Sequence, residues 1–180
     1  MKEDSLKSVL STSVYFLGIL IFIFFVITYV GQRIEVSGSS MAPTLADHDN
    51  LLVDKLSYRF DDPKRFDIVV FPYRYEPDTR YIKRIIGLPG ESVYIDYEGN
   101  IYINGYKLEE GYGAETIQDP GRAYEVIELG EDEYFVLGDN RNHSMDSRDP
   151  NVGNIRRSEL IGKAFMRVYP FNMLGMIKHQ

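Results

Sequence analysis

The sequence has no cysteine and few histidines, and both shortages limit its chemistry. Among 180 residues cysteine is absent, and the three histidines, His48, His143 and His179, are scattered. The lack of cysteine excludes disulfides, thiolate metal sites, a lipoprotein anchor and a cysteine nucleophile. The scattered histidines make a histidine-ligated metal site unexpected. A hydrolase built from this chain must therefore find its nucleophile among Ser, Thr, Asp or Glu.

Basic residues are also in short supply. Lys and Arg number 20 against 27 Asp and Glu, which gives a net charge of −7. This balance argues against a nucleic-acid partner held by phosphate neutralisation. The remaining composition, 44% hydrophobic and 26% charged, is ordinary for a globular protein with a core. We therefore expect one folded domain and no nucleic-acid partner.

One long apolar run stands out near the N-terminus. No charge occurs from Val9 to Val30, about 22 residues, which is enough to span hydrocarbon as a helix. A cleaved secretory signal would have an apolar region of about 7–15 residues and a small-x-small site, whereas this run ends Thr-Tyr-Val-Gly-Gln. We therefore expect a short tail over 1–8, an uncleaved transmembrane anchor over 9–31 and a working domain over 32–180. Basic residues flank both ends of the run, so charge leaves its orientation open.

After residue 31 the pattern is that of short β-strands. Branched and aromatic residues gather in runs bounded by Gly, Pro, Asp or Asn, and each run is too short for a helix. Four such runs are 50–54, 67–71, 80–86 and 133–137. They predict a mainly β domain, an antiparallel and barrel-like sheet structure behind one N-terminal helix.

A β-meander with a loop excursion is expected over 92–130. Residues 92–109 alternate in polarity, with turn residues at 98–100 and at Asn104-Gly105, which predicts three strands. The polar residues 110–122 are expected to form a loop before a strand over 123–129. Outside the N-terminal segment we expect little helix, with a short one near 156–160.

The first candidate for chemistry is the segment SGSSMAPTL over 37–45. Pro43 removes a backbone donor and biases Ala42 towards extended geometry, which favours a fixed turn at Ser40. Such a turn can present a hydroxyl and a backbone N–H together, as acyl transfer requires. A flexible Gly-Ser linker is the alternative, and the residues alone favour it.

The second candidate is the strand over 80–86, RYIKRII. Alternation places Tyr81 and Lys83 on one face and Ile82 and Arg84 on the other, and both faces are mainly apolar. At least one cation must then be desolvated or reach around to water. Burial lowers a lysine pKa, so Lys83 is a candidate general base. The alternative is an edge strand whose cations face water and block aggregation.

The third candidate is the polar loop GDNRNHSMDSR over 138–148. Asp146 and Arg148 can form a salt bridge that fixes the loop, and Ser144 can orient a base. An Asx-rich surface loop is the plain alternative. A calcium loop is disfavoured because the residue register is wrong. A Ser-His-Asp triad through His143 would leave Lys83 unused.

These segments, in this order behind one apolar anchor, resemble the type I signal peptidases. The resemblance covers the anchor and four segments, 40–45, 65–70, 83–91 and 138–148. It implies a membrane-anchored serine endopeptidase that uses no metal or organic cofactor and removes leader peptides from exported proteins after Ala-x-Ala sites. It reverses the preference for a linker at Ser40.

The resemblance also implies roles for individual residues. Ser40 would be the nucleophile, with its backbone N–H in the oxyanion hole, and Lys83 the general base. Ser144 would hold the lysine amine, and Asp146 with Arg148 would support the site. Candidate pocket walls are Val36, Met41, Leu45 and Ile82, for which core packing is the alternative.

Two departures from the family pattern limit the resemblance. Some relatives have a serine at the position of Gly38, and its hydroxyl completes the oxyanion hole, so a second donor must come from elsewhere near Gly38. Asn142-His143 also stand where relatives often have Asp-Asn.

The resulting hypothesis is a single-pass enzyme of the Gram-positive kind, with its N-terminus in the cytoplasm and its catalytic domain outside. Its partners would be the signal peptides of preproteins and the lipid bilayer. Rival hypotheses are another Ser-Lys protease of the same clan and a non-catalytic, membrane-tethered binding or chaperone module for secreted or pilus proteins.

Overall fold

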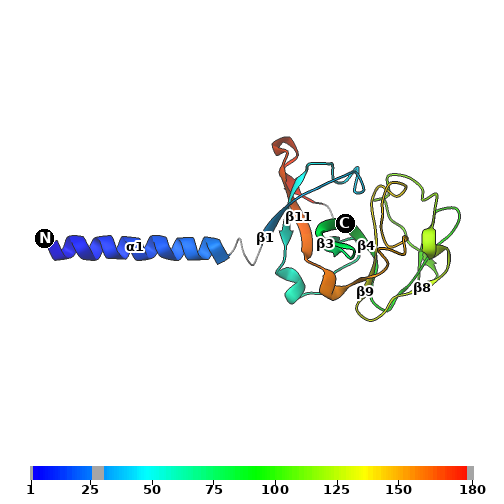
Figure 1. Cartoon of the computed structure of the whole chain (residues 1–180), viewed down its shortest axis with the longest axis horizontal. Helices are drawn as coiled ribbons and strands as arrows, with labels where there is room; N and C mark the ends of the chain where they lie inside the picture. Colours follow the sequence, from blue (N-terminus) through cyan, green and yellow to red (C-terminus); the bar gives the residue numbers. More distant parts are fainter. Residues whose placement is uncertain (1, 26–30, 178–180) are drawn as a thin grey trace.

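A computed structural model describes residues 2–25 and 31–177 of the chain, with side chains described over 10–24 and 31–177. Helix α1, Lys2–Phe25, precedes a domain built from two β-sheets (Figure 1). Of the described residues, none forms a helix with both the length and the apolar character that a membrane crossing requires. The anchor expected over 9–31 includes residues 26–30, which lie outside the described part.

The larger sheet contains eight strands among the described residues. Its order is β1-β2-β11-β3-β4-β9-β10, with β12 paired to β11, and every pairing is antiparallel. The strands are β1 Gly31–Glu35, β2 Asn50–Asp54, β3 Ile68–Tyr73, β4 Glu76–Gly87, β9 Glu133–Leu137, β10 Ile155–Arg156, β11 Gly162–Tyr169 and β12 Gly175–Met176. All four runs of branched and aromatic residues form strands, so the mainly antiparallel β domain is confirmed.

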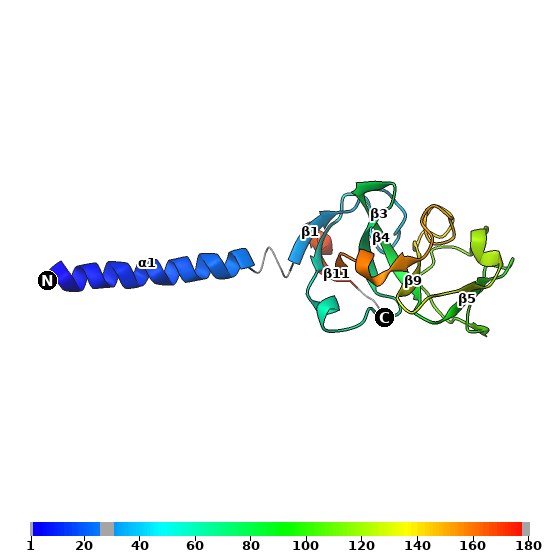
Figure 2. The same ribbon diagram turned by 60° about the horizontal axis from the view of Figure 1, so that its bottom comes forward.

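The smaller sheet has four strands in the described chain, in the order β7-β6-β5-β8. They are β5 Ser92–Ile95, β6 Ile101–Ile103, β7 Tyr106–Lys107 and β8 Ile127–Glu128. In Figures 1 and 2 this sheet lies at the end of the domain away from β1. The expected meander forms, and Asn104 and Gly105 both have positive φ, as its turn requires.

Two local expectations are corrected. The strand expected over 123–129 is reduced to β8, because a 3-10 helix, η3 Gly121–Tyr124, follows Pro120 and takes the preceding residues. The helix expected near 156–160 is a single 3-10 turn, η4 Arg157–Glu159, capped by the Glu159 carboxylate, which accepts the backbone N–H of Arg156 at 2.7 Å. Two further 3-10 turns are η2 Ser57–Arg59 and η5 Phe171–Met173.

Strand β4 joins the hydrophobic cores of the domain. It contributes Ile82 to the core beneath β1, β2 and β11, Ile85 to the core shared with β3 and β9, and Ile86 to the core of the smaller sheet. All three side chains are buried. Since any shift of this strand would disturb three packed clusters, the residues between these anchors, Lys83 and Arg84, are held at fixed positions.

Candidate active site

The turn that carries Ser40 is fixed by hydrogen bonds from the polar loop 138–148. Asn140 donates its backbone N–H to the Ser40 carbonyl at 3.0 Å and its side-chain amide to the Ser39 carbonyl at 3.1 Å. Within the turn, the Ala42 N–H donates to the Ser39 carbonyl at 3.0 Å. A flexible linker would make none of these bonds, so this alternative for Ser40 is wrong.

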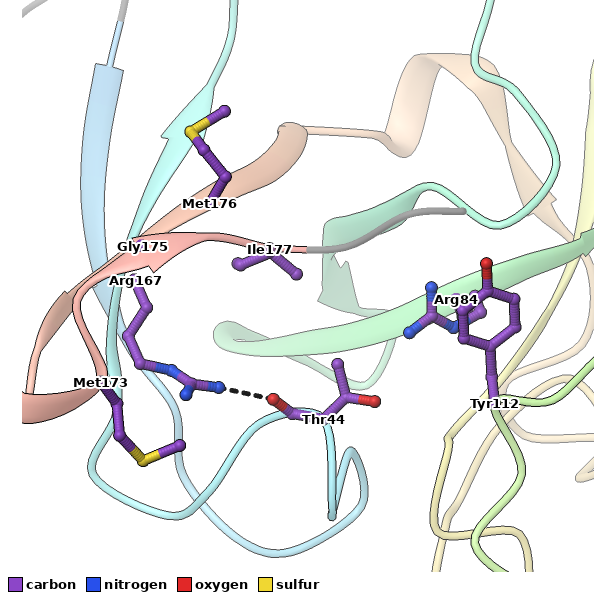
Figure 3. Close-up of a pocket in the computed structure, with 8 residues that line it drawn as sticks. All are labelled: Thr44, Arg84, Tyr112, Arg167, Met173, Gly175, Met176 and Ile177. Atoms are coloured by element: carbon purple, nitrogen blue, oxygen red, sulfur yellow. Dashed lines mark hydrogen bonds between the residues drawn. The ribbon is translucent and has the colours of Figure 1, made fainter.

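The far end of the same turn is held from β11. Figure 3 shows the Arg167 guanidinium donating to the Thr44 carbonyl beside a pocket of about 370 Å³. Arg167 also forms an ion pair with the buried Asp49 carboxylate at 2.9 Å. The Thr44 hydroxyl donates to Asp139 at 2.5 Å. This turn over 37–45, called the nucleophile turn below because it carries the candidate nucleophile Ser40, is therefore attached both to the sheet and to the polar loop.

Lys83 reaches the Ser40 hydroxyl from β4. Its Nζ lies 2.7 Å from Ser40 Oγ and 3.1 Å from the Ile82 carbonyl oxygen. The residue is only 3% exposed, and this burial lowers the pKa of the amine to about 8, although the Asp146 and Asp139 carboxylates act in the opposite direction. An amine with this pKa is substantially neutral near pH 8 and can accept a proton.

Arg84, the next residue, is buried on the other face of β4. Its guanidinium donates to both Asp139 carboxylate oxygens, at 2.8 and 2.7 Å, and to the Phe66 carbonyl at 2.9 Å. It also lies against the Tyr112 ring, 3.8 Å from the centroid (Figure 3). Lys83 and Arg84 are thus both buried, and the alternative that these two cations face water on an edge strand is wrong.

The loop 138–148 is braced by the predicted Asp146–Arg148 ion pair. Arg148 Nε lies 2.8 Å from Asp146 Oδ1, and Asp146 Oδ2 accepts the Gly138 N–H at 3.1 Å. Arg148 also donates to the Asp119 carbonyl at 3.1 Å. The Asp139 carboxylate thus forms an ion pair with Arg84, and the Asp146 carboxylate forms one with Arg148.

A pocket of about 200 Å³ opens beside Ser40 and Lys83. Of the four wall residues proposed from the sequence, only Ile82 lines it. Val36, Met41 and Leu45 do not line it and are buried in the core cluster to which Ile82 also belongs, so for these three the core-packing alternative holds. The other lining residues are Ser37, Arg80, Tyr81 and Met145. Alternation already placed Tyr81 on the face of Lys83, whereas the sequence carried no signal for Met145.

Comparisons with known proteins show the family of this chain. The family model described as signal peptidase, peptidase S26, matches residues 9–169. A probable signal peptidase I-2 of Synechocystis is 41% identical over 155 residues, which cover 83% of this chain and 68% of that protein. Signal peptidase I U of Bacillus subtilis is 35% identical over 184 aligned positions, covering 98% of this chain and 95% of that protein. The chain belongs to the signal peptidase family.

A solved structure is also similar. A crystal structure of a signal peptidase I from Enterococcus faecalis is 35% identical, with a TM-score of 0.47, and covers 57% of this chain and 97% of that one. As a member of the signal peptidase I group, this chain is a serine endopeptidase that takes part in secretion processing.

Ser144 lies next to the nucleophile turn of this signal peptidase without contacting the lysine amine. A Cβ built on Gly138 would come within 2.2 Å of Ser144 Oγ and 2.5 Å of the Ser40 carbonyl oxygen, so all three residues meet at one point. Ser144 Oγ is nevertheless buried without a hydrogen-bond partner in the described part of the chain. The Lys83 amine is directed to Ser40 and to Ile82 instead.

Gly38, the departure from the signal peptidase pattern, has its backbone N–H engaged. The N–H donates to Asp47 Oδ1 at 2.7 Å, and Gly38 has a φ of +90°, which favours glycine. His143 is exposed and donates its backbone N–H to the Asn140 carbonyl at 3.0 Å. Ser40 Oγ contacts Lys83 Nζ at 2.7 Å, which favours a Ser-Lys dyad over a His143 triad.

Proposed function

We propose that this signal peptidase removes N-terminal signal peptides from translocated preproteins, cleaving after small-x-small sites with a Ser40–Lys83 dyad. The observation that carries the proposal is the 2.7 Å contact between Lys83 Nζ and Ser40 Oγ, made by a buried lysine whose pKa is lowered to about 8. A serine hydroxyl is a weak nucleophile until a positioned base takes its proton.

The dyad supports an acyl-transfer mechanism in two halves. Neutral Lys83 accepts the hydroxyl proton as Ser40 Oγ attacks the carbonyl carbon of the residue before the cleaved bond. The Ser40 backbone N–H stabilises the oxyanion, and the lysine ammonium then gives its proton to the leaving amine, which releases the mature protein. Water, deprotonated by Lys83, next attacks the acyl-enzyme ester, and Ser40 recovers its proton as the signal peptide leaves.

Ser144, Asp146 and Arg148 act as positioning residues in this proposal. The Asp146–Arg148 ion pair stabilises the loop 138–148, and Asn140 of this loop donates its backbone N–H to the Ser40 carbonyl. Ser144 has a buried hydroxyl near that carbonyl with no hydrogen-bond partner in the described part of the chain, so this hydroxyl is available to hold the lysine amine during turnover. The backbone near Gly38 would supply any second oxyanion donor.

The free edge of β4 supports substrate binding by strand addition. Strand β3 pairs with residues 80–84 of β4. On the other side of β4, the pairing with β9 begins only at Arg84. Residues 80–83 therefore have one edge that pairs with no strand in the described chain, and Lys83 on this stretch contacts Ser40. An extended peptide can hydrogen-bond to such an edge, and the pocket of about 200 Å³ would admit a small side chain from it.

The uncharged run 9–30 supports membrane attachment, which is general in this family. We propose a cytoplasmic tail over 1–8, an anchor over 9–31 and an extracytoplasmic catalytic domain over 32–180, the single-pass type II arrangement. This puts the dyad on the side where a preprotein emerges after translocation.

The test is cleavage of a preprotein with an Ala-x-Ala junction by the full-length protein in detergent. We expect a product N-terminus directly after the second alanine, identified by mass spectrometry. Ser40→Ala and Lys83→Ala should lower kcat on the order of 10³-fold or more. Lys107→Ala is the matched control, because this exposed lysine lies on the smaller sheet.

Two results would contradict the proposal. Normal cleavage by Lys83→Ala would remove the lysine as base while leaving the activity in place. Binding of the preprotein without turnover by a folded wild type, unaffected by either substitution, would favour the binding-module hypothesis.

A further inference from the structure

A second pocket, of about 640 Å³, adjoins the polar loop 138–148. Its lining residues come from two stretches of the chain, 118–124 and 141–150. Ser144 lines this pocket, and the next residue, Met145, lines the pocket that contains Ser40 and Lys83. The two pockets therefore adjoin at one point of the loop, and a peptide bound across Ser40 can continue from one into the other.

Arg141, a buried residue that lines the second pocket, has an unused donor. The residue is 2% exposed, its Nε donates to the Gly138 carbonyl at 3.1 Å, and its Nη1 forms an ion pair with Glu110 at 2.8 Å. Its Nη2 is buried and has no hydrogen-bond partner in the described part of the chain. Because a guanidinium cannot give up its protons, this donor needs an acceptor, and a carbonyl oxygen of a bound peptide is one.

Arg122 brings to the pocket a positive charge that has no ion-pair partner among the residues that the structure describes. Its guanidinium donates to the Ser147 carbonyl at 2.9 Å and to the side-chain oxygen of Asn154. Both acceptors are neutral, and the Glu133 carboxylate contacts Asn154, at 2.7 Å, rather than the arginine. The charge of Arg122 is therefore available to a carboxylate from outside.

The two aspartates that line the pocket already accept backbone donors of their own loops. Asp119 Oδ1 accepts the Gly121 N–H at 2.8 Å, and Asp149 Oδ1 accepts the Asn151 N–H at 2.8 Å. A simple anion would use the arginine charge alone and would meet these carboxylates. A peptide fits both kinds of group, because its backbone carries donors as well as acceptors and its side chains can carry charge.

We infer that this pocket binds the segment of the preprotein that follows the cleaved bond, and that Arg122 favours an acidic side chain in that segment. The inference rests on the function proposed above, in which the residues before the cleaved bond lie along β4. The residues after it must leave Ser40 in another direction, and the pocket that begins at Ser144 receives them. A pocket of about 640 Å³ is roughly 9 Å across, the length of about three extended residues.

The experiment uses the full-length protein in detergent at low salt, where exposed charges are least screened. Three preproteins share one Ala-x-Ala junction and differ only at the second to fourth residues after the cleaved bond, which are all Glu, all Gln or all Lys. The quantity measured is the ratio of kcat/KM for the Glu preprotein to kcat/KM for the Lys preprotein.

We expect a ratio of about tenfold in the wild type and about twofold in Arg122→Gln, because the substitution removes one partly exposed attraction for Glu and one repulsion for Lys. Arg122→Lys keeps the charge and should retain most of the ratio. High salt should lower the wild-type ratio towards that of Arg122→Gln.

Arg59→Gln is the matched control. Arg59 is an exposed arginine on η2, and it does not line the pocket. Its removal should leave the ratio unchanged. Each ratio compares two substrates of the same variant, so a general loss of folding or of dyad activity cancels, and thermal unfolding measures any loss of stability separately.

The outcomes separate this inference from the proposed function. A wild-type ratio near one overturns the inference, and so does an equal fall in kcat/KM for all three preproteins in Arg122→Gln, which would show a purely structural role. In both cases wild-type cleavage of the Gln preprotein still stands. Failure of the wild type to cleave any of the three preproteins overturns the proposed function itself.

Discussion

At Lys83, burial and charge act against each other within one side chain. Burial lowers the pKa of the amine from 10.5 to about 8, and the carboxylates of Asp146 and Asp139 oppose that shift. The change corresponds to about 3 kcal/mol of destabilisation of the ammonium relative to the amine. The same desolvation that weakens the charged form therefore prepares the neutral base.

This predicts the pH profile of the enzyme. Because only the neutral amine accepts the Ser40 proton, kcat/KM should rise with pH through an apparent pKa of about 8 and level off above it. Below that pH, activity should fall about tenfold per unit as the ammonium form dominates. Initial rates between pH 6 and 10 measure the profile. A profile set by an apparent pKa near 6.5 and abolished in His143→Ala would instead support the triad.

Single residues also show where sequence reasoning ends. Alternation around Lys83 indicated that a cation must be desolvated or reach around to water, because that pattern is local. That Arg84 is buried as well as Lys83 depends on its ion pair with Asp139, 55 residues further along the chain. Likewise, Met41 and Leu45 follow Ser40 closely in sequence, and both are buried in a core cluster and do not line the pocket beside it. Contacts of this kind depend on loop conformation, so they produce no periodic pattern in the sequence from which they could be predicted.

Among the elements, the start of the nucleophile turn is held by a hydrogen bond to Asp47, which the sequence analysis did not predict. Asp47 accepts the Gly38 N–H at 2.7 Å, and His48 lies beside it, with Nε2 3.4 Å from Asp47 Oδ2 and Nδ1 2.8 Å from Glu35. The hydrogen bond with Glu35 and the charge of Asp47 raise the pKa of His48. The carboxylate thus fixes the start of the turn, two residues before Ser40.

We predict that Asp47 positions the turn for catalysis. Asp47→Ala should lower kcat roughly tenfold with a smaller change in KM, because the turn shifts while the β4 edge stays in place. Asp47→Asn keeps the acceptor oxygen and should retain most of the activity. Glu35→Ala, which removes the partner of His48 and leaves the Gly38 bond, is the control. Equal kcat in wild type and Asp47→Ala would contradict the prediction.

The elements themselves were more predictable than their contacts. Short branched runs gave β2, β3, β4 and β9, because a strand and its turn residues are decided locally. The strand expected over 123–129 failed because Pro120 and Gly121 turn the chain into a 3-10 helix. The pairing of β11 between β2 and β3 joins segments about 100 residues apart, and no local pattern specifies it.

For the whole molecule, the Arg84–Asp139 pair is the contact that joins the separate parts. Both side chains are fully buried. Asp139 also accepts the Thr44 hydroxyl from the nucleophile turn, and Arg84 lies on Tyr112, which packs against the core of the smaller sheet. The nucleophile turn, the polar loop, β4 and the smaller sheet therefore meet at one ion pair.

The pair predicts a characteristic pattern of stability. Arg84→Met leaves the Asp139 carboxylate buried without its counter-charge and should lower the free energy of unfolding by about 3–5 kcal/mol. The double variant Arg84→Met, Asp139→Leu removes both charges and should recover much of that loss, because apolar replacement of a buried pair is often close to neutral. Asp62→Asn, which breaks the exposed ion pair with Arg157, should cost less than about 1 kcal/mol.

Denaturant unfolding followed by circular dichroism measures these three variants, together with the single variant Asp139→Leu, against the wild type. A double variant as unstable as the sum of its single substitutions would show that the two side chains stabilise the fold independently and do not act as a pair. A double variant more stable than Arg84→Met alone would show instead that the unpaired carboxylate causes the loss. Since Asp139 also holds Thr44, we expect the double variant to recover stability without recovering activity, which separates the role of the pair in folding from its role in placing Ser40.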